Sequence, residues 1–560
     1  MSNKDIAEVL EMTSKLITLH GGDENRAKVL GGVSFNLERS EENLSELTEA
    51  ELQKIRGVGK SIASLILEIK EKGTTQELLD LYDKTPEGVL EMFKVKGLGV
   101  KKIKMLWEEL GIDNLNDLQI ACESGKIAQI KGFGEKTQVS ILASLALLRT
   151  YAGKVRMNEA WNLSAEIERK LQHIWETVKV VGAVPRALQE VDTLSFLVAA
   201  DFTEKLKLPE EFKENLSISS PYCWRGTFLD HVLTVSIRFC NANDLVAEQV
   251  IETSGQEHLN TIGAGGKSFY HYLKTNNFDT EEAYYEGFTG SYIVPEMRDS
   301  AFGFEWAKEN TPDSLISMDD LKGTVHNHST YSDGRNSLIE MAKAAQDMGL
   351  SYFGIADHSQ TAAYANGLLP NRVLDQHKEI DQLNAGFTDF KILKGIESDI
   401  LSNGDLDYEA DLLKEFDYVV ASVHANLSMS EEKANERLIK AIENPYTTIL
   451  GHPTGRLILS RSGYPIDHKK IIDACAANGV VMEVNASPYR LDIDWKWMPY
   501  CIEKGVLLSI NPDAHSTVGL LDMHYGVAVC RKAGVKKEHV FNALTLPEIQ
   551  SYLTNRKALK

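Results

Sequence analysis

The stretch GTVHNHSTYSDG, residues 323–334, decides the fold of the carboxy-terminal half of the chain. It opens as a short apolar run, which is typical of a buried strand, and closes on histidines and a carboxylate. The chain then repeats this unit of apolar run, polar cluster and amphipathic helix. The other runs are YFGIADH (352–358), FKILKGIESD (390–399), YVVASVH (418–424), TTILGHP (447–453), VVMEVNA (480–486) and VLLSINPDAH (506–515). Seven strands alternating with helices predict a parallel barrel.

Side chains that bind metals lie at the carboxyl ends of these runs, where a parallel barrel gathers its functional groups. Six of the fifteen histidines fall there, although strand ends are a small part of the chain. A lone histidine near a strand is more often a core or surface residue. That explanation does not suit nine potential metal ligands that all lie at strand ends. Imidazoles with carboxylates suit Zn²⁺, Mn²⁺ or Fe²⁺, and the lack of cysteine argues against a purely structural zinc site. The candidate metal ligands are His326, His328, Asp333, His358, Glu397, His424, His452, Asp513 and His515.

The first 150 residues show short amphipathic helices joined by glycine-containing turns. One pattern occurs three times, as LQKIRGVGKSIASLI from Leu52, FKVKGLGVKKIKML from Phe93 and IAQIKGFGEKTQVSI from Ile127. It resembles the helix-hairpin-helix module, in which two glycines let a phosphate approach the N–H groups at a helix start. One copy alone would suggest only a hairpin turn, whereas three indicate DNA binding without base readout. The candidate DNA-binding residues are Gly57, Gly59, Lys60, Gly97, Gly99, Lys101, Lys102, Gly132, Gly134 and Lys136.

The segment GAVPRALQEVDTLSFLVAA, residues 182–200, resembles the palm signature of family X DNA polymerases, Gly-Ser-x-Arg-Arg followed by Asp-x-Asp on a strand. The metal-binding aspartates of that signature are replaced here by Thr193 and Ser195, and the third carboxylate by Ser236. Hydroxyl groups cannot supply the negative charge that holds two Mg²⁺ ions against a triphosphate. Asp192 is one residue out of register and should point to the opposite face of the strand. We therefore expect a palm that keeps its fold and has lost polymerase activity.

Composition limits the environment and the partners. The 60 basic and 81 acidic side chains give a net charge of -21, which argues against coating DNA by bulk electrostatics, so any DNA contact must be local. The six cysteines form no CxxC pair and are expected to be reduced thiols. The sequence has neither a signal peptide pattern nor a run long and apolar enough for a membrane span. A cytoplasmic protein without membrane contact is expected.

Seven motifs in order, HNHSTYSDG, ADHS, GIESDI, SVHANL, GHPTGRLI, EVNASPYRLD and NPDAHS, resemble those of the PHP (polymerase and histidinol phosphatase) domain. With the amino-terminal part, the whole chain resembles bacterial family X DNA polymerase with a PHP domain. The resemblance implies a distorted (β/α)7 barrel with three divalent metal ions, Mn²⁺ or Zn²⁺, with Fe²⁺ as a further candidate. It implies that His326, His328, Glu397 and Asp513 hold one ion, that Glu397, His424 and His452 hold a second, and that Asp333, His358 and His515 hold a third.

The expected organisation is multidomain. Residues 1–150 would form an all-α helix-hairpin-helix domain that combines an 8-kDa-like part with fingers. Residues 151–295 would form a mixed α/β (α+β) palm and thumb of degenerate polymerase type. A linker over 296–320 would lead to the PHP metallo-phosphoesterase domain at 321–560.

The predicted function is metal-dependent hydrolysis of phosphoesters. The metal ions would lower the pKa of a bridging water, which would then ionise to hydroxide. The substrate would be gapped, nicked or primer-template DNA, and the activity a 3′-to-5′ exonuclease of DNA repair, an abasic-site endonuclease or a 3′-phosphatase. Arg456, Arg461 and Arg490 would bind substrate phosphate or form surface ion pairs. Glu483 and Asn485 are expected to support the ligands.

Three other functions stay open at this point. One is an active polymerase with PHP proofreading, which the missing palm carboxylates disfavour. Another is a small-molecule phosphatase of the histidinol phosphatase kind, which would need no DNA-binding repeats. The last is a non-catalytic DNA-binding scaffold, which the complete ligand set disfavours. A monomer is favoured.

Overall fold

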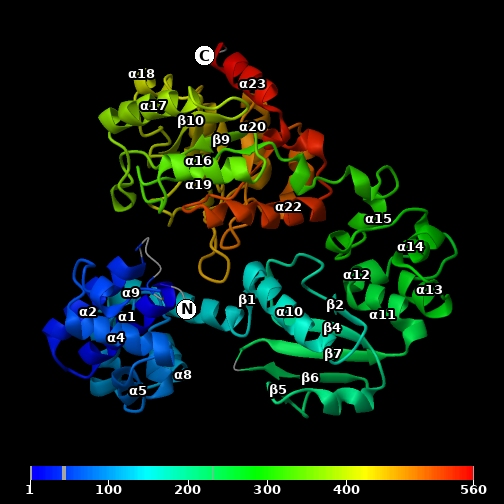
Figure 1. Ribbon diagram of the computed structural model, residues 1–560, viewed down its shortest axis with the longest axis horizontal. Coiled ribbons are helices and arrows are strands. Elements are labelled where there is room, and N and C mark those ends of the chain that lie inside the picture. Colours follow the sequence, from blue (N-terminus) through cyan, green and yellow to red (C-terminus); the bar gives the residue numbers. More distant parts are fainter. Residues whose placement is uncertain (1–2, 39, 41–43, 45, 230, 559–560) are drawn as a thin grey trace. The chain divides into compact units, whose positions relative to one another are not determined.

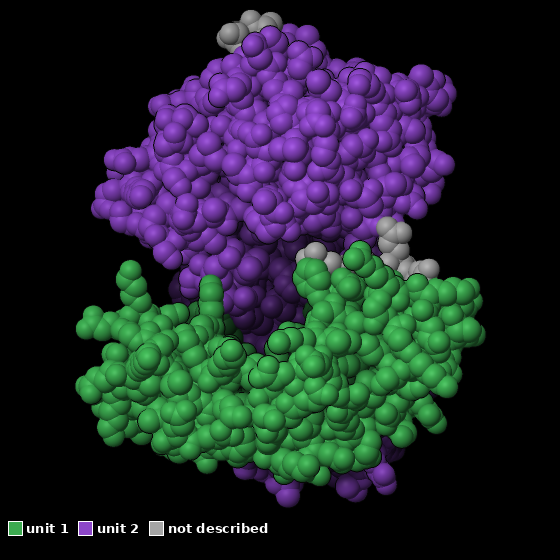
Figure 2. Space-filling model, turned by 90° about the vertical axis from the view of Figure 1, so that its left-hand side faces the viewer, with its two compact units in different colours: residues 1–152 green, residues 153–560 purple. Residues whose placement is uncertain are grey.

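The computed structural model describes residues 3–38, 40, 44, 46–229 and 231–558. The chain divides into two compact units, residues 1–152 and residues 153–560 (Figure 2). The first unit is helical, and the second contains a mixed α/β part followed by a parallel barrel. Among the described residues, no helix combines the length and apolar character that crossing a membrane requires.

Unit 1 is built from helices, as the sequence predicts. They are α1 (Asn3–Leu19), α2 (Glu24–Glu38), α3 (Glu49–Leu52), α4 (Lys60–Lys72), α5 (Gln76–Tyr82), α6 (Glu87–Met92), α7 (Val100–Lys104), α8 (Leu115–Glu123) and α9 (Gly134–Tyr151). The apolar faces of these amphipathic helices pack into two clusters, one around Ile62 and Ile66 and the other around Leu106 and Leu118. The polar faces and the turns are left for solvent or for a ligand.

Each of the three repeats turns through a glycine with a left-handed backbone. Gly57 and Gly97 have φ of +91° and Gly132 has φ of +99°, a conformation that favours glycine. In the first two repeats the second glycine is the extended N-cap of α4 or α7. The third repeat differs, because α9 begins at Gly134 itself, whose φ is +66°. The repeats therefore share the turn, and the helix start is varied in the last copy.

The first part of unit 2 is a five-stranded sheet in the order β2-β4-β7-β6-β5. Its strands are β2 (Val178–Val181), β4 (Thr193–Ala199), β5 (Phe212–Glu214), β6 (Cys223–Phe228) and β7 (Thr234–Cys240). The buried side chains of β4 and β7 pack against helix α10 (Met157–Gln172). The central pair β4 and β7 is parallel, and the register places Ser195 beside Ser236.

Helices α11 (Leu245–Glu252), α12 (Gln256–Leu259), α13 (Phe269–Thr275) and α14 (Glu281–Thr289) follow the sheet. The chain then passes through α15 (Phe302–Trp306) to the barrel. Residues 296–320, which the composition suggests as a linker, are held on the barrel by hydrogen bonds. Trp306 Nε1 donates to the Gly534 carbonyl at 3.2 Å, and the Ile316 amide donates to the Val535 carbonyl at 3.0 Å. The buried Lys532 adds an ion pair with Asp299.

The barrel has seven parallel strands in the order β14-β13-β12-β11-β10-β9-β8. They are β8 (Gly323–Thr324), β9 (Tyr352–Ile355), β10 (Lys391–Asp399), β11 (Tyr418–Ser422), β12 (Ile449–Leu450), β13 (Val481–Asn485) and β14 (Leu508–Asn511). The segments after β8 and β14 approach each other through a parallel bridge between Asn327 and Ala514, which nearly closes the barrel. The seven apolar runs of the sequence are therefore these strands.

Helices cover the outside of the barrel (Figure 1). The longer ones are α16 (Leu338–Asp347), α17 (Pro370–Asn384), α19 (Glu431–Glu443), α20 (His468–Asn478), α22 (Met523–Lys532) and α23 (Leu546–Ala558). Outward-facing strand residues such as Phe353 and Ile355 pack in the same cluster as Met341 of α16. This packing fixes the strand ends from which the polar side chains project.

The interior of the barrel changes character along its axis. One end holds apolar side chains, including Tyr352, Val481 and Ile449, together with Phe541 and Ile549 from the carboxy-terminal segment. The carboxyl ends of the strands carry buried polar groups instead. Since strand side chains alternate, a residue two positions along faces the same interior. The polar groups at the strand ends therefore converge inside the barrel mouth.

Candidate metal centre

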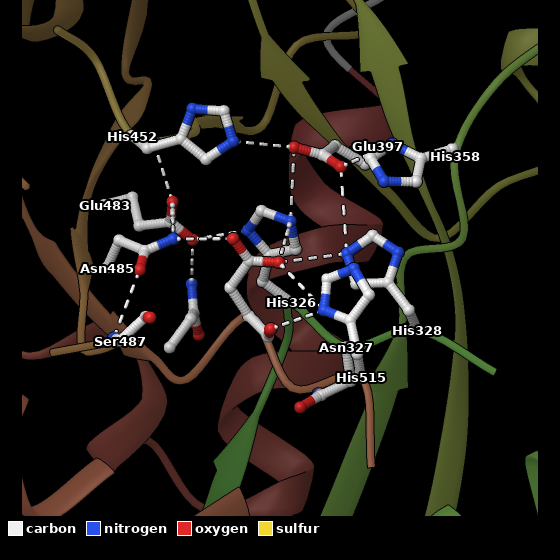
Figure 3. A network of polar contacts seen from close by, with 12 residues as sticks. His326, Asn327, His328, His358, Glu397, His452, Glu483, Asn485, Ser487 and His515 are labelled. Carbon is white, nitrogen blue, oxygen red and sulfur yellow. Dashed lines mark hydrogen bonds and ion pairs between the residues drawn. The ribbon is translucent and has the colours of Figure 1, made fainter. Parts of the chain in front are cut away.

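Nine side chains converge at the carboxyl ends of the barrel strands, and Figure 3 shows most of them. They form four overlapping groups, which are His328, Asp333, His358 and His515; His326, His328 and Asp513; His326, Glu397 and His452; and His358, Glu397 and His424. Within each group the potential ligand atoms lie within 4.8 Å of one another. The structure therefore brings together all nine side chains that the strand ends indicate.

Glu397, on β10, lies at the middle of the cluster and is only 1% exposed. Its Oε1 is 3.0 Å from His452 Nε2 and 3.1 Å from His424 Nε2. The same oxygen is 3.3 Å from His326 Nε2. Its Oε2 is 2.9 Å from His358 Nδ1. A single carboxylate thus faces four imidazoles, and it belongs to two of the candidate metal groups.

Asp513 and His515 complete the cluster on the side of the first strand. Asp513 Oδ1 lies 3.0 Å from His328 Nε2, and the backbone of Asp513 is left-handed with φ of +54°. The His328 and His515 rings stack with centroids 4.1 Å apart. His515 Nε2 is 3.4 Å from Asp333 Oδ1. Because Asp333 is exposed whereas His328 is buried, the cluster opens to solvent on this side.

Two further carboxylates, those of Glu483 and Asp399, contact candidate ligand imidazoles and orient them. Glu483 is fully buried, with Oε1 at 2.6 Å from His326 Nδ1, and its Oε2 accepts the His452 amide at 2.7 Å. Asp399 Oδ1 lies 2.5 Å from His424 Nδ1. Partners of this kind fix the orientation of an imidazole so that its other nitrogen faces the metal. Asp399 was not among the sequence candidates, although its place two residues after Glu397 on β10 puts it on the same face.

The donor set fits divalent metal ions because several of its buried atoms make no hydrogen bond within the protein. Among the residues that the structure describes, such atoms include His326 Nε2, His328 Nδ1, His358 Nδ1, Glu397 Oε2 and His452 Nδ1. Some of them face each other without forming a hydrogen bond, as His358 Nδ1 and Glu397 Oε2 do at 2.9 Å. A buried polar atom without a hydrogen bond costs about 1–3 kcal/mol, and a bound cation would remove that cost. Imidazoles and carboxylates without thiolates favour Mn²⁺, Zn²⁺ or Fe²⁺.

Nearby carboxylates keep some imidazoles of the cluster protonated when no metal is bound. Burial opposes the charged form of His424, but Glu397 and Asp399 outweigh it and raise the pKa of His424 to about 10. Against the same burial penalty, Asp333 and Asp513 raise the pKa of His515 to about 9. Burial dominates at His328, and with the neighbouring imidazoles it lowers the pKa to about 3. Against burial, Glu483, Asp513 and Glu397 also raise the pKa of His326 well above its ordinary value. At neutral pH the metal-free cluster therefore holds His326, His424 and His515 as cations.

We expect metal binding to release protons and to strengthen with pH. A ligand imidazole must be neutral, so each of His326, His424 and His515 gives up its proton when the pH is below its pKa. The apparent affinity should rise roughly tenfold per pH unit for each such proton, and the rise should become less steep near pH 9 to 10, where His515 and His424 become neutral. Calorimetric titration with Mn²⁺ in buffers of different ionisation enthalpy measures the protons released. An affinity independent of pH between 6.5 and 9 would contradict this assignment.

The three candidate arginines have different surroundings. Arg456 pairs with Asp494 at 2.7 Å and donates to Gln189 Oε1 at 3.1 Å, so it joins the barrel to the preceding domain. Arg461 donates to the Gly455 carbonyl at 2.8 Å within its own loop. Arg490 alone borders the cluster, with Nε at 3.5 Å from Asp513 Oδ2. The geometry therefore places one of the three at the metal centre.

The positions of the expected palm carboxylates meet on one face of the five-stranded sheet. Thr193, Ser195 and Ser236 are half-buried and alternate with fully buried core residues. Ser236 Oγ lies 3.1 Å from Cys223 Sγ, and Arg225 is its partner on β6. Asp192 is exposed at the start of the strand. This face presents hydroxyl groups and a guanidinium where a metal would require carboxylates.

Comparison with known proteins supports three parts of this description. The family description "PHP domain" matches residues 324–487. "Helix-hairpin-helix domain" matches residues 1–75, and "SAM-like Helix-hairpin-helix tandem" matches residues 89–146. The first of these covers the barrel strands from β8 to β13, and the others contain the three glycine turns.

Similar proteins fall into two groups by coverage. The chain is 33% identical to the Bacillus subtilis (strain 168) protein named "DNA polymerase/3'-5' exonuclease PolX", and the alignment covers 99% of each chain. It is 28% identical to a protein of Thermoanaerobacter sp. (strain X514) named as a probable phosphatase, over 42% of this chain and 94% of that one. A probable phosphatase of Shewanella frigidimarina (strain NCIMB 400) is also 28% identical, over 42% and 90% respectively.

Proposed function

The chain belongs to the family of the bacterial DNA polymerase/3'-5' exonuclease PolX, and from this premise we propose that it is a metal-dependent phosphoesterase that removes nucleotides from the 3′ end of DNA. The observation that carries the proposal is the cluster of nine ligand side chains around the buried Glu397. The helix-hairpin-helix turns and the similarity to PolX over the whole chain favour DNA over a small phosphate ester.

The ligands divide among three ions in this proposal. His326, His328, Glu397 and Asp513 hold one, Glu397, His424 and His452 hold a second, and Asp333, His358 and His515 hold a third. One geometric group, His326 with His328 and Asp513, falls within the first set, and a second contains the whole third set together with His328. The other two groups, His326 with Glu397 and His452 and His358 with Glu397 and His424, each combine ligands of two ions. Bound divalent ions supply a water of lowered pKa as nucleophile and neutralise the charge that builds on the phosphoryl group.

Other side chains of the protein orient the proposed ligands and would bind the substrate phosphate. Glu483 and Asp399 hold His326 and His424 in fixed orientations, as their short contacts indicate. Arg490, which is half-buried beside Asp513, is the arginine that would bind a non-bridging phosphate oxygen. Arg456 would serve the fold instead, since its guanidinium is already bound to Asp494 and Gln189.

We further propose that the palm has lost polymerase activity. The name of the Bacillus subtilis relative includes a polymerase, but Thr193, Ser195 and Ser236 cannot supply the carboxylates that nucleotidyl transfer requires. The five-stranded sheet would then serve as a frame, because Gln189 and Asp299 tie it to the barrel through Arg456 and Lys532.

The test is purified protein with 5′-labelled primer-template DNA in Mn²⁺. We expect a ladder of primers shortened from the 3′ end, abolished by a chelator and by Asp513→Ala. A single internal cut at an abasic site would indicate an endonuclease instead. Removal of a 3′-phosphate without shortening would favour the phosphatase activity that the names of the shorter relatives suggest. Intact primer under all these conditions would reject the proposal.

DNA should bind through the glycine turns of unit 1. At the first turn the helical hydrogen bonds begin with the Ile62 amide and the Gly59 carbonyl, so the amides of Lys60 and Ser61 at the start of α4 have no helical partner and could bind a phosphate. We expect the triple variant Lys60→Ala, Lys101→Ala, Lys136→Ala to bind DNA more weakly. Its slope of log K against log salt should be shallower by about 0.9 for each phosphate that the replaced lysines neutralise in the wild-type complex.

The matched control replaces three lysines outside the turns, Lys4, Lys28 and Lys72, each of which faces a glutamate one helical turn away. This control should bind with the wild-type slope. Fluorescence anisotropy at 50 to 200 mM salt measures both. Equal slopes for the two triple variants would mean that the turns do not contact phosphates.

A further inference from the structure

Tyr364 is a large aromatic side chain left in solvent at the mouth of the metal cluster. It lies on the short helix Ala363–Ala365, within the segment that follows the ligand His358, and is 66% exposed. Its ring centroid is 6.1 Å from that of His358, with the two planes inclined by 59°. The ring therefore stands beside a candidate metal ligand with most of its surface free.

A single exposed aromatic residue is ordinary on a protein surface, so position alone is not enough. The segment around Tyr364 is, however, firmly attached to the ligand cluster at its start. The Thr361 hydroxyl donates to Asp399 Oδ2 at 2.8 Å, and Asp399 is the residue that orients His424. The Thr361 amide donates to Asp407 Oδ2 at 2.7 Å, and the Thr361 hydroxyl oxygen lies 2.9 Å from the same carboxylate oxygen.

The other end of the segment is anchored as well. Asn366 Nδ2 donates to the carbonyls of Tyr331 and Ser332, directly before the ligand Asp333. The small side chains of Ala362 and Ala365 are buried on either side, whereas the ring between them points outward. Hydrogen bonds on both sides of the exposed ring thus attach its segment to residues that lie next to the candidate metal ligands.

Among the described residues of the barrel, the other exposed tyrosine is differently placed. Tyr489 is 43% exposed, but the Arg156 guanidinium covers its ring at 4.4 Å from the centroid. Its neighbour Arg490 borders the cluster beside Asp513. The metal mouth therefore has a guanidinium suited to phosphate at Asp513 and an uncovered aromatic face at His358.

We propose that Tyr364 is the platform on which the terminal nucleobase of the DNA strand stacks while its phosphodiester lies at the metal centre. This inference rests on the proposed nuclease function and names the feature of the substrate that the site recognises. Stacking suits an exonuclease because every base offers an aromatic face, so the site holds each successive end without reading sequence. A simple phosphate ester without a base would gain nothing from the ring.

The experiment compares DNA ending in a normal 3′ nucleotide with the same DNA ending in a base-less 3′ residue. Wild-type protein should prefer the normal end, and Tyr364→Ala should reduce that preference by roughly 5- to 100-fold in kcat/KM, the range of one base-aromatic stack. Tyr364→Phe should keep the preference, since the ring remains. Tyr222→Ala, which removes a tyrosine of similar exposure (71%) from the five-stranded sheet region, is the matched control and should behave as wild type.

A second readout does not depend on cleavage. DNA with 2-aminopurine at its 3′ end should lose fluorescence when it binds the wild-type and Tyr364→Phe proteins in chelator, and less so with Tyr364→Ala. If Tyr364→Ala lost activity equally on normal and base-less 3′ ends and left the fluorescence quenching unchanged, the stacking role would be wrong. Tyr364 would then be a structural residue. Quenching that depends on Tyr364 without any cleavage would reject the nuclease function and leave the platform standing.

Discussion

Replacing Glu397 by glutamine is expected to abolish removal of nucleotides from 3′ ends, with kcat lower by roughly 1,000-fold or more, because charge stabilisation by bound ions contributes several kcal/mol. The substitution keeps the shape of the side chain and removes its charge. Glu397 faces His326, His358, His424 and His452 at 2.9 to 3.3 Å, so its loss affects two of the candidate metal groups at once.

The measurement combines a single-turnover assay on end-labelled DNA with the metal content of the purified variant. Glu415→Gln is the control, since the same change at this exposed residue of the barrel should leave both unchanged. Circular dichroism must show that the Glu397→Gln barrel is folded. A folded variant that retains a tenth of the wild-type rate would mean that Glu397 does not hold the catalytic ions.

No templated incorporation of nucleotides is expected from this protein. The proposed nuclease activity would shorten primers and mask weak extension, so the assay uses the Asp513→Ala variant, in which a proposed metal ligand of the barrel is removed and the palm is untouched. The register of β4 and β7 sets Ser195 beside Ser236, and Arg225 lies opposite Ser236 on β6. This arrangement supplies positive charge and hydroxyl groups to a place where two Mg²⁺ ions would need carboxylates.

The assay supplies all four dNTPs with Mg²⁺ or Mn²⁺ on a gapped primer-template, beside an active family X polymerase as positive control for the DNA. We expect no primer longer than the starting material, which corresponds to a rate at the detection limit. Any metal-dependent extension by Asp513→Ala would show that carboxylates outside Thr193, Ser195 and Ser236 serve the reaction, and the palm would then be a working polymerase.

Much of the metal centre could be predicted because its signals are local. Each candidate ligand lies at the end of a recognisable strand or after it, and parallel strands of a barrel bring their carboxyl ends to one mouth. The first and last candidate ligands, His326 and His515, are nearly two hundred positions apart in the sequence. The strand-helix repeat alone nevertheless predicts that the candidate ligands lie close together. The glycine turns of unit 1 could also be predicted from the sequence, because the left-handed backbone at Gly57, Gly97 and Gly132 favours glycine.

The roles of the arginines could not be predicted in this way. Arg456, Arg461 and Arg490 follow similar strand ends, and nothing local distinguishes them. Arg461 bonds within its own loop, whereas Arg456 reaches Gln189, 267 positions away, and Arg490 forms an ion pair with Asp513 at the end of another strand. Hydrogen bonds made across such sequence separations depend on how the domains pack.

The sequence by itself determined the strand-helix order, the nine candidate ligands and the absence of carboxylates at Thr193, Ser195 and Ser236, because backbone periodicity and side-chain chemistry are properties of neighbouring residues. Only the tertiary structure decided which groups hold those ligands in place and what stands at the mouth of the cluster. Asp399, Thr361 and Tyr364 acquire their positions from contacts between separate strands and loops. Such contacts are fixed by packing in three dimensions, which no local pattern encodes.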